Sequence, residues 1–337
     1  MNSLLHSFSA AHTVLPPSPR SDYLSVVIPC FNEEEGLGEA LKRVDAACIA
    51  AAVPAYEIIL IDDGSQDRTW EIISAAGREN PHIVGVRLAR NFGHQLALSA
   101  GLTIVTGDRI FVLDADLQDP PELLTDMMRL MDEGADVVYG QRQEREGETA
   151  TKKLTAKLFY RFLAKLTDID IPVDTGDFRL MSRRVVELLN SMPESNRFIR
   201  GMVSWVGFKQ VGLPYRRRER FAGTTKYPLK KMLRLAVDAI TGFSIKPLRV
   251  ASYCGAAFGL AGFILMIYVA LSWFDNSTIR GWTSLISIVL LLGSAQIIVL
   301  GVIGEYIGRL FIQGKGRPNF IISDVTGGGD SVRALPR

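Results

Sequence analysis

The residues best suited to chemistry stand in one short stretch, FVLDADLQD at positions 111–119. Its three carboxylates repel one another unless a cation or a substrate lies among them. Asp114 and Asp116 are two residues apart, so in an extended segment their side chains share one side, which Gln118 continues. Three oxygen donors in this register suit Mg²⁺ or Mn²⁺, with waters and a diphosphate completing the coordination. We therefore expect a divalent cation here, acting as a Lewis acid on a departing nucleoside diphosphate.

The segments around this stretch alternate between short β-rich apolar runs and runs of helical period. Strands are expected at residues 24–29, 56–62, 83–88, 109–114 and 135–140, and helices at 36–51, 67–79, 93–106 and 119–132. This alternation predicts an α/β fold with a mainly parallel sheet that helices cover on both faces.

Polar groups follow four of the five expected strands. The sequences at these ends are PCFNEEEG, DDGSQD, DADLQD and GQRQER. In a parallel sheet the ligand lies outside the carboxyl ends of the strands, so we expect these groups to converge on one cleft. A single acidic strand end is usually a helix cap, which is the expectation for Asp67 and Asp119. Four such ends together favour a binding site.

Composition and the missing motifs exclude several classes of protein. The chain has 337 residues, 47% hydrophobic and 22% charged, which excludes a disordered protein. No G-x-x-x-x-G-K-[ST] loop is present, and GLGEAL at 36–41 lacks the third glycine of a dinucleotide fingerprint, so ATPases and dehydrogenases are disfavoured. Cys30, Cys48 and Cys254 have no disulfide or metal spacing, which is typical of structural thiols in a reducing compartment.

Positive charge is concentrated between residues 214 and 249, although the formal net charge is only +2. Ten lysines and arginines stand there against Glu219 and Asp238, which predicts an anionic partner. Nucleic acid is a weak candidate because no recognition motif accompanies the charge. Residues 228–245 also have an amphipathic helical period, so they can lie in a membrane interface with their cations near lipid phosphates. An ordinary packing helix is the alternative.

Two apolar runs near the C-terminus, 250–274 and 281–304, contain no charged residue. As helices each spans about 36 Å, enough for the ~30 Å hydrocarbon core of a bilayer. Only DNSTIR separates them, so we expect a membrane hairpin, with buried helices of a soluble protein as the alternative. Lysines and arginines flank both outer ends, which predicts that both ends are cytoplasmic.

These patterns predict six parts. They are a disordered tail at 1–22, a cytosolic domain at 23–227, an amphipathic juxtamembrane region at 228–249, transmembrane helices at 250–274 and 281–304, and a cytosolic tail at 305–337.

Five stretches in order, VVIPCFNEEEGL, IDDGSQD, NFGHQLALSAGL, DADLQDPPELL and DTGDFRLMSRR, carry a family resemblance. From about residue 23 to 322 the chain resembles the polyisoprenyl-phosphate glycosyltransferases of glycosyltransferase family two. It is most similar to the bacterial undecaprenyl-phosphate glucosyltransferase branch, and also similar to dolichol-phosphate mannose synthases. The resemblance implies a Rossmann-like nucleotide-sugar (GT-A) fold, a divalent metal, and inverting transfer of a hexose to a polyisoprenyl phosphate in the bacterial inner membrane.

The resemblance implies UDP-glucose as the first candidate donor. Mannose, N-acetylglucosamine, an aminoarabinose derivative, or a catalytically silent sugar-nucleotide sensor remain alternatives. The Q-x-x-R-W signature of processive synthases is absent, so single-sugar transfer is expected. The family likeness also suggests a homo-oligomer, a tetramer being possible. Gly255, Gly259 and Gly262 would permit close helix contacts between copies or within one hairpin.

Carried over to this sequence, the resemblance assigns donor-side roles. Asp63 would contact the uridine, Pro29 and Glu33 would line the same pocket, and Asp114 would support the nucleotide. Asp116 and Gln118 would be the metal ligands.

Asp177 falls at the position that the resemblance links to catalysis, as a base or as a carboxylate that orients the acceptor. A phosphate acceptor is already largely ionised near neutral pH, so strong base catalysis is less necessary than for a hydroxyl. Capping of the turn at Gly176 is the alternative for Asp177.

Two anionic reactants require cations beside the reacting phosphate. Arg142, just beyond the fifth strand, is the first candidate for a bidentate phosphate contact. Together with Asp177 it is expected to be a catalytic residue. Further acceptor-phosphate candidates are Arg179, Lys153, Lys157, Arg220 and Lys226. For the first two lysines a solvated helix face is an equal alternative, and the last two flank a small-residue loop that could equally be a linker. His94 is expected only to shape the loop before a helix.

Overall fold

Short apolar runs of the sequence form the strands of one mixed sheet in this computed structural model. The structure describes residues 23–143, 175–216, 244, 246–274 and 282–327. The strands are β1 (Tyr23–Cys30), β2 (Ala55–Asp62), β3 (Ile83–Leu88), β4 (Arg109–Val112), β5 (Val137–Arg142), β6 (Thr175–Ser182), β7 (Gln210–Tyr215) and β8 (Ile322–Gly327). Their order is β7-β5-β6-β4-β1-β2-β3-β8.

The centre of the sheet is parallel and its flanks are mixed. β4, β1, β2 and β3 run parallel, and β5 runs parallel to β7. β6 lies between β4 and β5 and is antiparallel to both. The predicted α/β fold with a mainly parallel sheet is therefore confirmed, and the insertion of β6 is what makes the sheet mixed.

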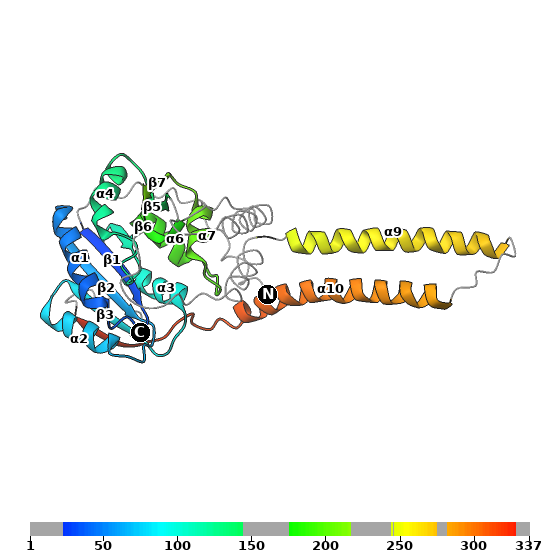
Figure 1. The fold of residues 1–337 in the computed structure, drawn as a ribbon, viewed down its shortest axis with the longest axis horizontal. Coiled ribbons are helices and arrows are strands. Elements are labelled where there is room, and N and C mark those ends of the chain that lie inside the picture. The colour runs from blue at the N-terminus through cyan, green and yellow to red at the C-terminus, as the bar shows by residue number, and fades with distance from the viewer. Residues whose placement is uncertain (1–22, 144–174, 217–243, 245, 275–281, 328–337) are drawn as a thin grey trace, which may run out of the picture.

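Helices cover both faces of the sheet, as the alternating pattern predicts (Figure 1). They are α1 (Leu37–Ala50), α2 (Thr69–Glu79), α3 (His94–Ile104), the 3-10 turn η1 (Pro121–Leu123), α4 (Leu124–Asp132), α6 (Arg183–Ser191) and α7 (Ile199–Val206). Side chains of α1, α2 and α4 pack in one apolar core, and those of α3, α6 and α7 pack in the other. Burying both faces explains why β1 and β2 are apolar without alternation.

Two long helices project from this domain side by side (Figure 1). They are α9 (Lys246–Phe274) and α10 (Trp282–Gly314), about 44 and 50 Å long at the usual helical rise. Both are long and apolar enough to cross a membrane, and their apolar side chains are largely exposed, such as Leu260 and Leu291 at 62% each. Tyr306 of α10 donates a hydrogen bond to the carbonyl of Ser244, just before α9 (2.6 Å).

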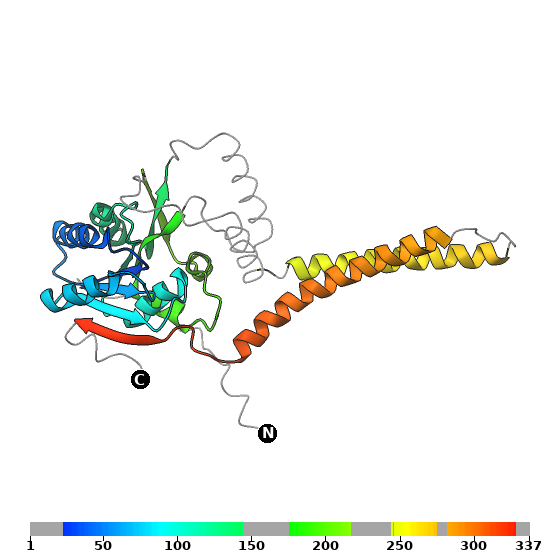
Figure 2. The same ribbon diagram turned by 60° about the horizontal axis from the view of Figure 1, so that its bottom comes forward.

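The chain returns to the sheet after α10, which the sequence analysis did not predict. Figure 2 shows the segment beyond α10 reaching the edge of the sheet, where β8 pairs antiparallel with β3. Gly85 of β3 makes room for this strand, because a Cβ there would lie 2.6 Å from a methyl group of Thr326. The expected tail at 305–337 therefore contains the end of a helix and an edge strand. A single six-residue strand of partly exposed residues carries too weak a pattern to be read from sequence.

Some expectations concern residues outside the described part of the chain. These are the N-terminal tail at 1–22, the amphipathic segment at 228–243, and the candidate phosphate ligands Lys153, Lys157, Arg220 and Lys226.

Candidate active site

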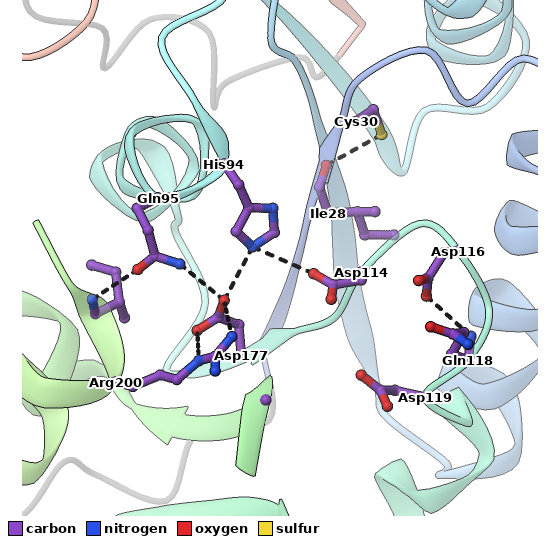
Figure 3. Close-up of polar contacts among 12 residues, drawn as sticks. Ile28, Cys30, His94, Gln95, Asp114, Asp116, Gln118, Asp119, Asp177 and Arg200 are labelled. Carbon is purple, nitrogen blue, oxygen red and sulfur yellow. Dashed lines mark hydrogen bonds and ion pairs between the residues drawn. The ribbon is translucent and has the colours of Figure 1, made fainter. Parts of the chain in front are cut away.

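The polar residues of the site gather beyond the carboxyl ends of the central strands (Figure 3). Asp63 follows β2, Asp114 follows β4, and Arg142 is the last residue of β5. Asp177 is the third residue of β6, and because β6 runs antiparallel to its neighbours, its first residues lie beside their carboxyl ends. This is the edge where an α/β sheet binds its ligand.

The acidic stretch after β4 is a turn and not an extended segment. β4 ends at Val112, a turn follows at residues 115–116, and Leu117 has a φ of 57°. A non-glycine residue in this left-handed region is uncommon and is often found at functional sites. The premise that Asp114 and Asp116 share one side of an extended chain is therefore wrong.

The three acids of this turn instead have three different partners, and Figure 3 shows those of Asp114 and Asp116. The partners are His94 for Asp114, the backbone N–H of Gln118 for Asp116, and Arg142 for Asp119. Burial and the charges of Asp177, Asp119 and Asp116 raise the pKa of Asp114, although His94 lowers it, so repulsion between the acids persists in the structure.

Asp177 is 2% exposed and is held by three side chains. Its Oδ1 accepts from Nε of Arg200 (2.9 Å), and its Oδ2 accepts from Nη2 of Arg200 (3.2 Å) and Nε2 of Gln95 (2.9 Å). Nε2 of His94 lies 3.1 Å from the same Oδ2. Burial disfavours the charged form, but Arg200 and His94 outweigh it and lower the pKa of Asp177 well below its usual value. Asp177 is therefore ionised and a weak base.

His94, expected only to shape a loop, lies between two carboxylates. Its Nε2 is 3.5 Å from Oδ1 of Asp114 in addition to its contact with Asp177. Burial lowers the pKa of His94, but Asp114 and Asp177 raise it more strongly, to about 9. Conversely, burial raises the pKa of Asp114, with His94 acting against the rise. His94 is thus positively charged near neutral pH and pairs with both Asp114 and Asp177.

The sequence did contain a signal for His94. The predicted site includes the carboxyl ends of four strands but not that of β3, which is followed by ARNFGHQ. Gln95 lies in the same segment, whereas Arg200 comes from α7 and Tyr215 from β7. No motif or spacing connects these last two residues to the site.

Asp63 positions the segment that carries His94. Its Oδ1 accepts the N–H of Phe92 (2.7 Å) and its Oδ2 accepts the N–H of Gly93 (2.9 Å), directly before α3. Burial raises the pKa of Asp63, although these two hydrogen bonds oppose the rise. The contact of Asp63 with uridine stays a prediction.

Pro29 and Glu33, the other predicted nucleotide residues, lie at and beyond the end of β1. Pro29 is buried in the strand beside Ile61, and Glu33 is half-buried with its backbone N–H donating to Oγ1 of Thr69 (2.9 Å). Both therefore stand at the same edge as Asp63, as a shared pocket requires. Their contact with a nucleotide also stays a prediction.

Arg142 joins a second cluster at the same edge. Its Nη2 lies 3.6 Å from Oδ2 of Asp119, its Nε donates to the hydroxyl of Tyr215 (3.3 Å), and that hydroxyl donates to Asp119. Asp67 accepts the N–H of Thr69 at the start of α2 (3.0 Å), as expected of a cap, whereas capping by Asp119 stays a prediction.

The absence of a side chain at Gly176 makes room for Arg142. A Cβ at Gly176 would lie only 2.7 Å from Nη2 of Arg142. Burial opposes the charge on Arg142, but Asp119 and Tyr215 raise its pKa, so it remains a full cation.

Arg179 lies beneath the site and not on its open side. It is 4% exposed, and its Nη2 donates to the carbonyl of Gly176 (2.9 Å). Burial lowers its pKa to about 10. In the structure Arg179 therefore supports the start of β6 at Gly176, and its contact with a phosphate stays a prediction.

Asp116 and Gln118 are suited to a divalent cation that also binds a diphosphate. They lie next to each other on one turn, and both side chains are partly exposed oxygen donors (Figure 3). Within the described ranges, no three His, Cys, Asp or Glu side chains are arranged to hold a metal. Two protein oxygens fit Mg²⁺ or Mn²⁺, which take further ligands from water and phosphate.

A mostly parallel mixed sheet with acids and arginines gathered at its carboxyl edge defines a GT-A-like fold, the architecture of nucleotide-sugar-dependent transferases. The chain belongs to glycosyltransferase family 2. The model described as "Glycosyl transferase family 2" matches residues 25–189, and the model described as "GtrB C-terminal hairpin" matches residues 246–310. The family inferred from the five motifs is thereby confirmed.

Relatives match almost the whole chain. It is 49% identical over 299 residues to the glycosyltransferase YkcC of Bacillus subtilis (strain 168), covering 88% of this chain and 92% of that one. It is 42% identical over 306 residues to the prophage bactoprenol glucosyl transferase homolog of Escherichia coli (strain K12), covering 90% and 99%. It is 40% identical over 305 residues to the bactoprenol glucosyl transferase of Shigella phage SfV, covering 89% and 98%.

Proposed function

We propose that the protein transfers glucose from UDP-glucose to a polyisoprenyl phosphate, such as undecaprenyl phosphate, with inversion. The reaction takes place at the cytoplasmic face of a bacterial inner membrane. Two relatives named as bactoprenol glucosyl transferases, 40–42% identical over nearly their full length, support this acceptor and this sugar. The observation that carries the proposal is a glycosyltransferase site in one chain with a hairpin apolar enough to cross a membrane.

On the donor side, Asp116 and Gln118 would hold Mg²⁺ or Mn²⁺, which would supply Lewis-acid stabilisation of the departing UDP. Pro29, Glu33 and Asp63 line the nucleotide pocket. Asp114, whose carboxylate lies between this turn and His94, supports the nucleotide.

On the acceptor side, Arg142 binds the phosphate of the lipid carrier. A phosphate oxygen attacks the anomeric carbon opposite the bond to UDP, so one bond forms as the other breaks and the configuration inverts. The acceptor phosphate is already mostly ionised near neutral pH. Asp177, with a lowered pKa and both oxygens hydrogen-bonded, therefore orients groups and does not remove a proton.

The hairpin of α9 and α10 spans the bilayer with both of its outer ends in the cytoplasm. Lys246 and Arg249 at the start of α9 support this topology, as do Lys315 and Arg317 after α10. The pairing of β8 with β3 supports it independently, because it holds the chain on both sides of the hairpin in one domain. Assembly into a homo-oligomer, with a tetramer as one possible size, is part of the proposal.

The test uses purified protein, undecaprenyl phosphate, Mg²⁺ and separate radiolabelled UDP-sugars, with label followed into the lipid phase. We expect label from UDP-glucose alone. Label from another UDP-sugar in its place would change the proposed donor. No label from any donor, with UDP binding retained, would favour a nucleotide-sugar sensor.

A further inference from the structure

His94 connects two parts of the site that come from different strands. Its Nε2 lies 3.1 Å from Oδ2 of Asp177 in β6 and 3.5 Å from Oδ1 of Asp114 after β4 (Figure 3). Asp177 stands on the acceptor side of the proposed reaction and Asp114 on the donor side. One ring nitrogen therefore sets the separation of a donor-side and an acceptor-side carboxylate.

The position of the ring is set by the backbone. His94 is the first residue of α3, and both oxygens of Asp63 bind the two N–H groups just before it. Gly93 has a φ of 97°, a backbone conformation that residues other than glycine rarely adopt. The end of β2 thus fixes where α3 begins, and the start of α3 fixes the imidazole.

The carboxylates near His94 pair with different cations. Arg200 pairs with Asp177, and Arg142 pairs with Asp119. Within the part of the chain that the structure describes, His94 is the cation at ion-pair distance from Asp114. Its raised pKa agrees with this role. Without the imidazole, Asp114 would face the charge of Asp177 with no intervening cation, and the two carboxylates would move apart.

We infer that His94 is a positioning residue of the transfer reaction, holding Asp114 and Asp177 at the separation that transfer requires. It acts through these two carboxylates and not on a substrate. The inference rests on the proposed function, because transfer is the activity that His94 would support. A misplacement of reacting groups by about 1 Å lowers a rate by about 10²-fold, which sets the expected effect.

The experiment compares the parent protein with His94→Ala and His94→Gln, and uses His82→Ala as a matched control. His82 precedes β3, and its ring stacks on Tyr56. For each protein we would measure kcat and KM with UDP-glucose, the Kd of UDP by calorimetry, and rescue of transfer by free imidazole. The side chain of His94 is 36% exposed, so imidazole can reach the vacated position.

We expect His94→Ala to lower kcat by about 10²-fold, with KM and the Kd of UDP changed by less than about threefold. His94→Gln should lie between the parent and His94→Ala, since an amide can donate to Asp177 but carries no charge for Asp114. Free imidazole should restore part of the activity of His94→Ala. His82→Ala should transfer like the parent.

Several outcomes would overturn the inference. One is an active parent together with a His94→Ala variant within about twofold of its kcat. A loss of UDP affinity in proportion to the loss of activity would make His94 a nucleotide ligand, and unfolding of both His94 variants would make it a structural residue. An inactive parent that still binds UDP would contradict the proposed function itself, so the two failures are distinguishable.

Discussion

Two carboxylates, Glu57 and Asp177, are each only 2% exposed but lie at opposite ends of the central parallel strands, Glu57 near their amino ends and Asp177 near their carboxyl ends. Oε1 of Glu57, near the start of β2, accepts from the hydroxyl of Ser25 (2.5 Å) and from the hydroxyl and N–H of Thr106 (2.7 and 2.8 Å). These donors are neutral and belong to β1 and to the turn before β4. This carboxylate connects three adjacent segments of the domain.

Asp177 differs in the kind of donor that holds it. Arg200 and His94 carry positive charge, come from α7 and α3, and are partly exposed, at 32% and 36% of their side chains. Neutral donors satisfy a buried carboxylate and stabilise the fold. Charged donors keep the carboxylate ionised, and donors that also reach the surface connect it to the open side of the site. The comparison teaches that burial alone does not distinguish a structural acid from a functional one.

The largest effect should come from the turn after β4, the proposed metal site. Asp116→Ala should lower transfer by about 10³-fold or more, because it removes a proposed ligand of the cation that would stabilise the departing UDP. The amount of protein in the membrane fraction should not change. Asp126→Ala, an exposed acid in the first turn of α4, is the matched control and should transfer normally. Activity of Asp116→Ala near that of the parent would remove Asp116 from the metal site.

The second prediction tests the two buried acids directly. Asp177→Asn should lower kcat by about 10²-fold, because the amide loses the charge that orients Arg200 and His94. Glu57→Gln, which changes the other acid in the same way, should leave kcat unchanged. Steady-state kinetics with a saturating acceptor provides the measurement. Equal losses of kcat in both variants would contradict the proposal that Asp177 is a functional acid and Glu57 a structural one.

The third prediction reverses the order of the two acids in a stability measurement. Glu57→Ala leaves the donors on Ser25 and Thr106 unpaired in a buried place, which should lower the free energy of unfolding by about 2–3 kcal/mol. Thermal unfolding in detergent would detect this as a lower Tm. The activity per folded molecule should stay at the parent's level. A Glu57→Ala protein with an unchanged Tm would show that the hydrogen bonds of Glu57 contribute little to stability.

A smaller change at Gly176 should affect the acceptor side alone. Gly176→Ala places a Cβ against the guanidinium of Arg142, which is flexible enough to move. Weakening one charged contact by about 1 kcal/mol should raise the KM for the lipid phosphate about fivefold. The KM for UDP-glucose should stay near that of the parent, and a change in the donor KM instead would contradict the assignment of Arg142.

The last expected effect is a dependence of stability on pH that comes from His94 and Asp177. The pKa of His94 is raised from 6.5 to about 9 in the folded protein, so its contribution is complete below pH 6.5 and is lost as the pH rises through 9. The pKa of Asp177 is lowered from 3.8, so its contribution is complete above that value and is lost in stronger acid. The Tm of the parent should therefore fall between pH 6.5 and 9.5 more than that of His94→Gln. Parallel curves for the two proteins would contradict this.

Much of the fold could be predicted because its signals are local. The expected strands near β1, β2 and β3 and the helices between them depend on periodicities within single segments, and the structure confirms them. β6 and β8 were missed as strands because their places depend on pairing with distant residues. The turn after β4 was misjudged because the left-handed conformation of Leu117 has no signature in its residue type.

The site was predictable where strand ends position the residues. The rule that ligands bind at the carboxyl ends of strands predicted that Asp114 and Arg142 lie at the same end of the sheet, and the family resemblance added Asp177. The same rule applied to β3 would have found His94. Arg200 could not be found in this way, because it reaches the site only through the packing of α7 against β6.

Because β8 follows α10, the apolar hairpin of α9 and α10 interrupts the domain and does not follow it. An experimenter who wants a water-soluble enzyme should therefore excise the hairpin as if it were a loop and rejoin the flanking chain with a linker. Ending the polypeptide at Gly314 would discard β8 and uncover the backbone edge of β3, a ready template for aggregation.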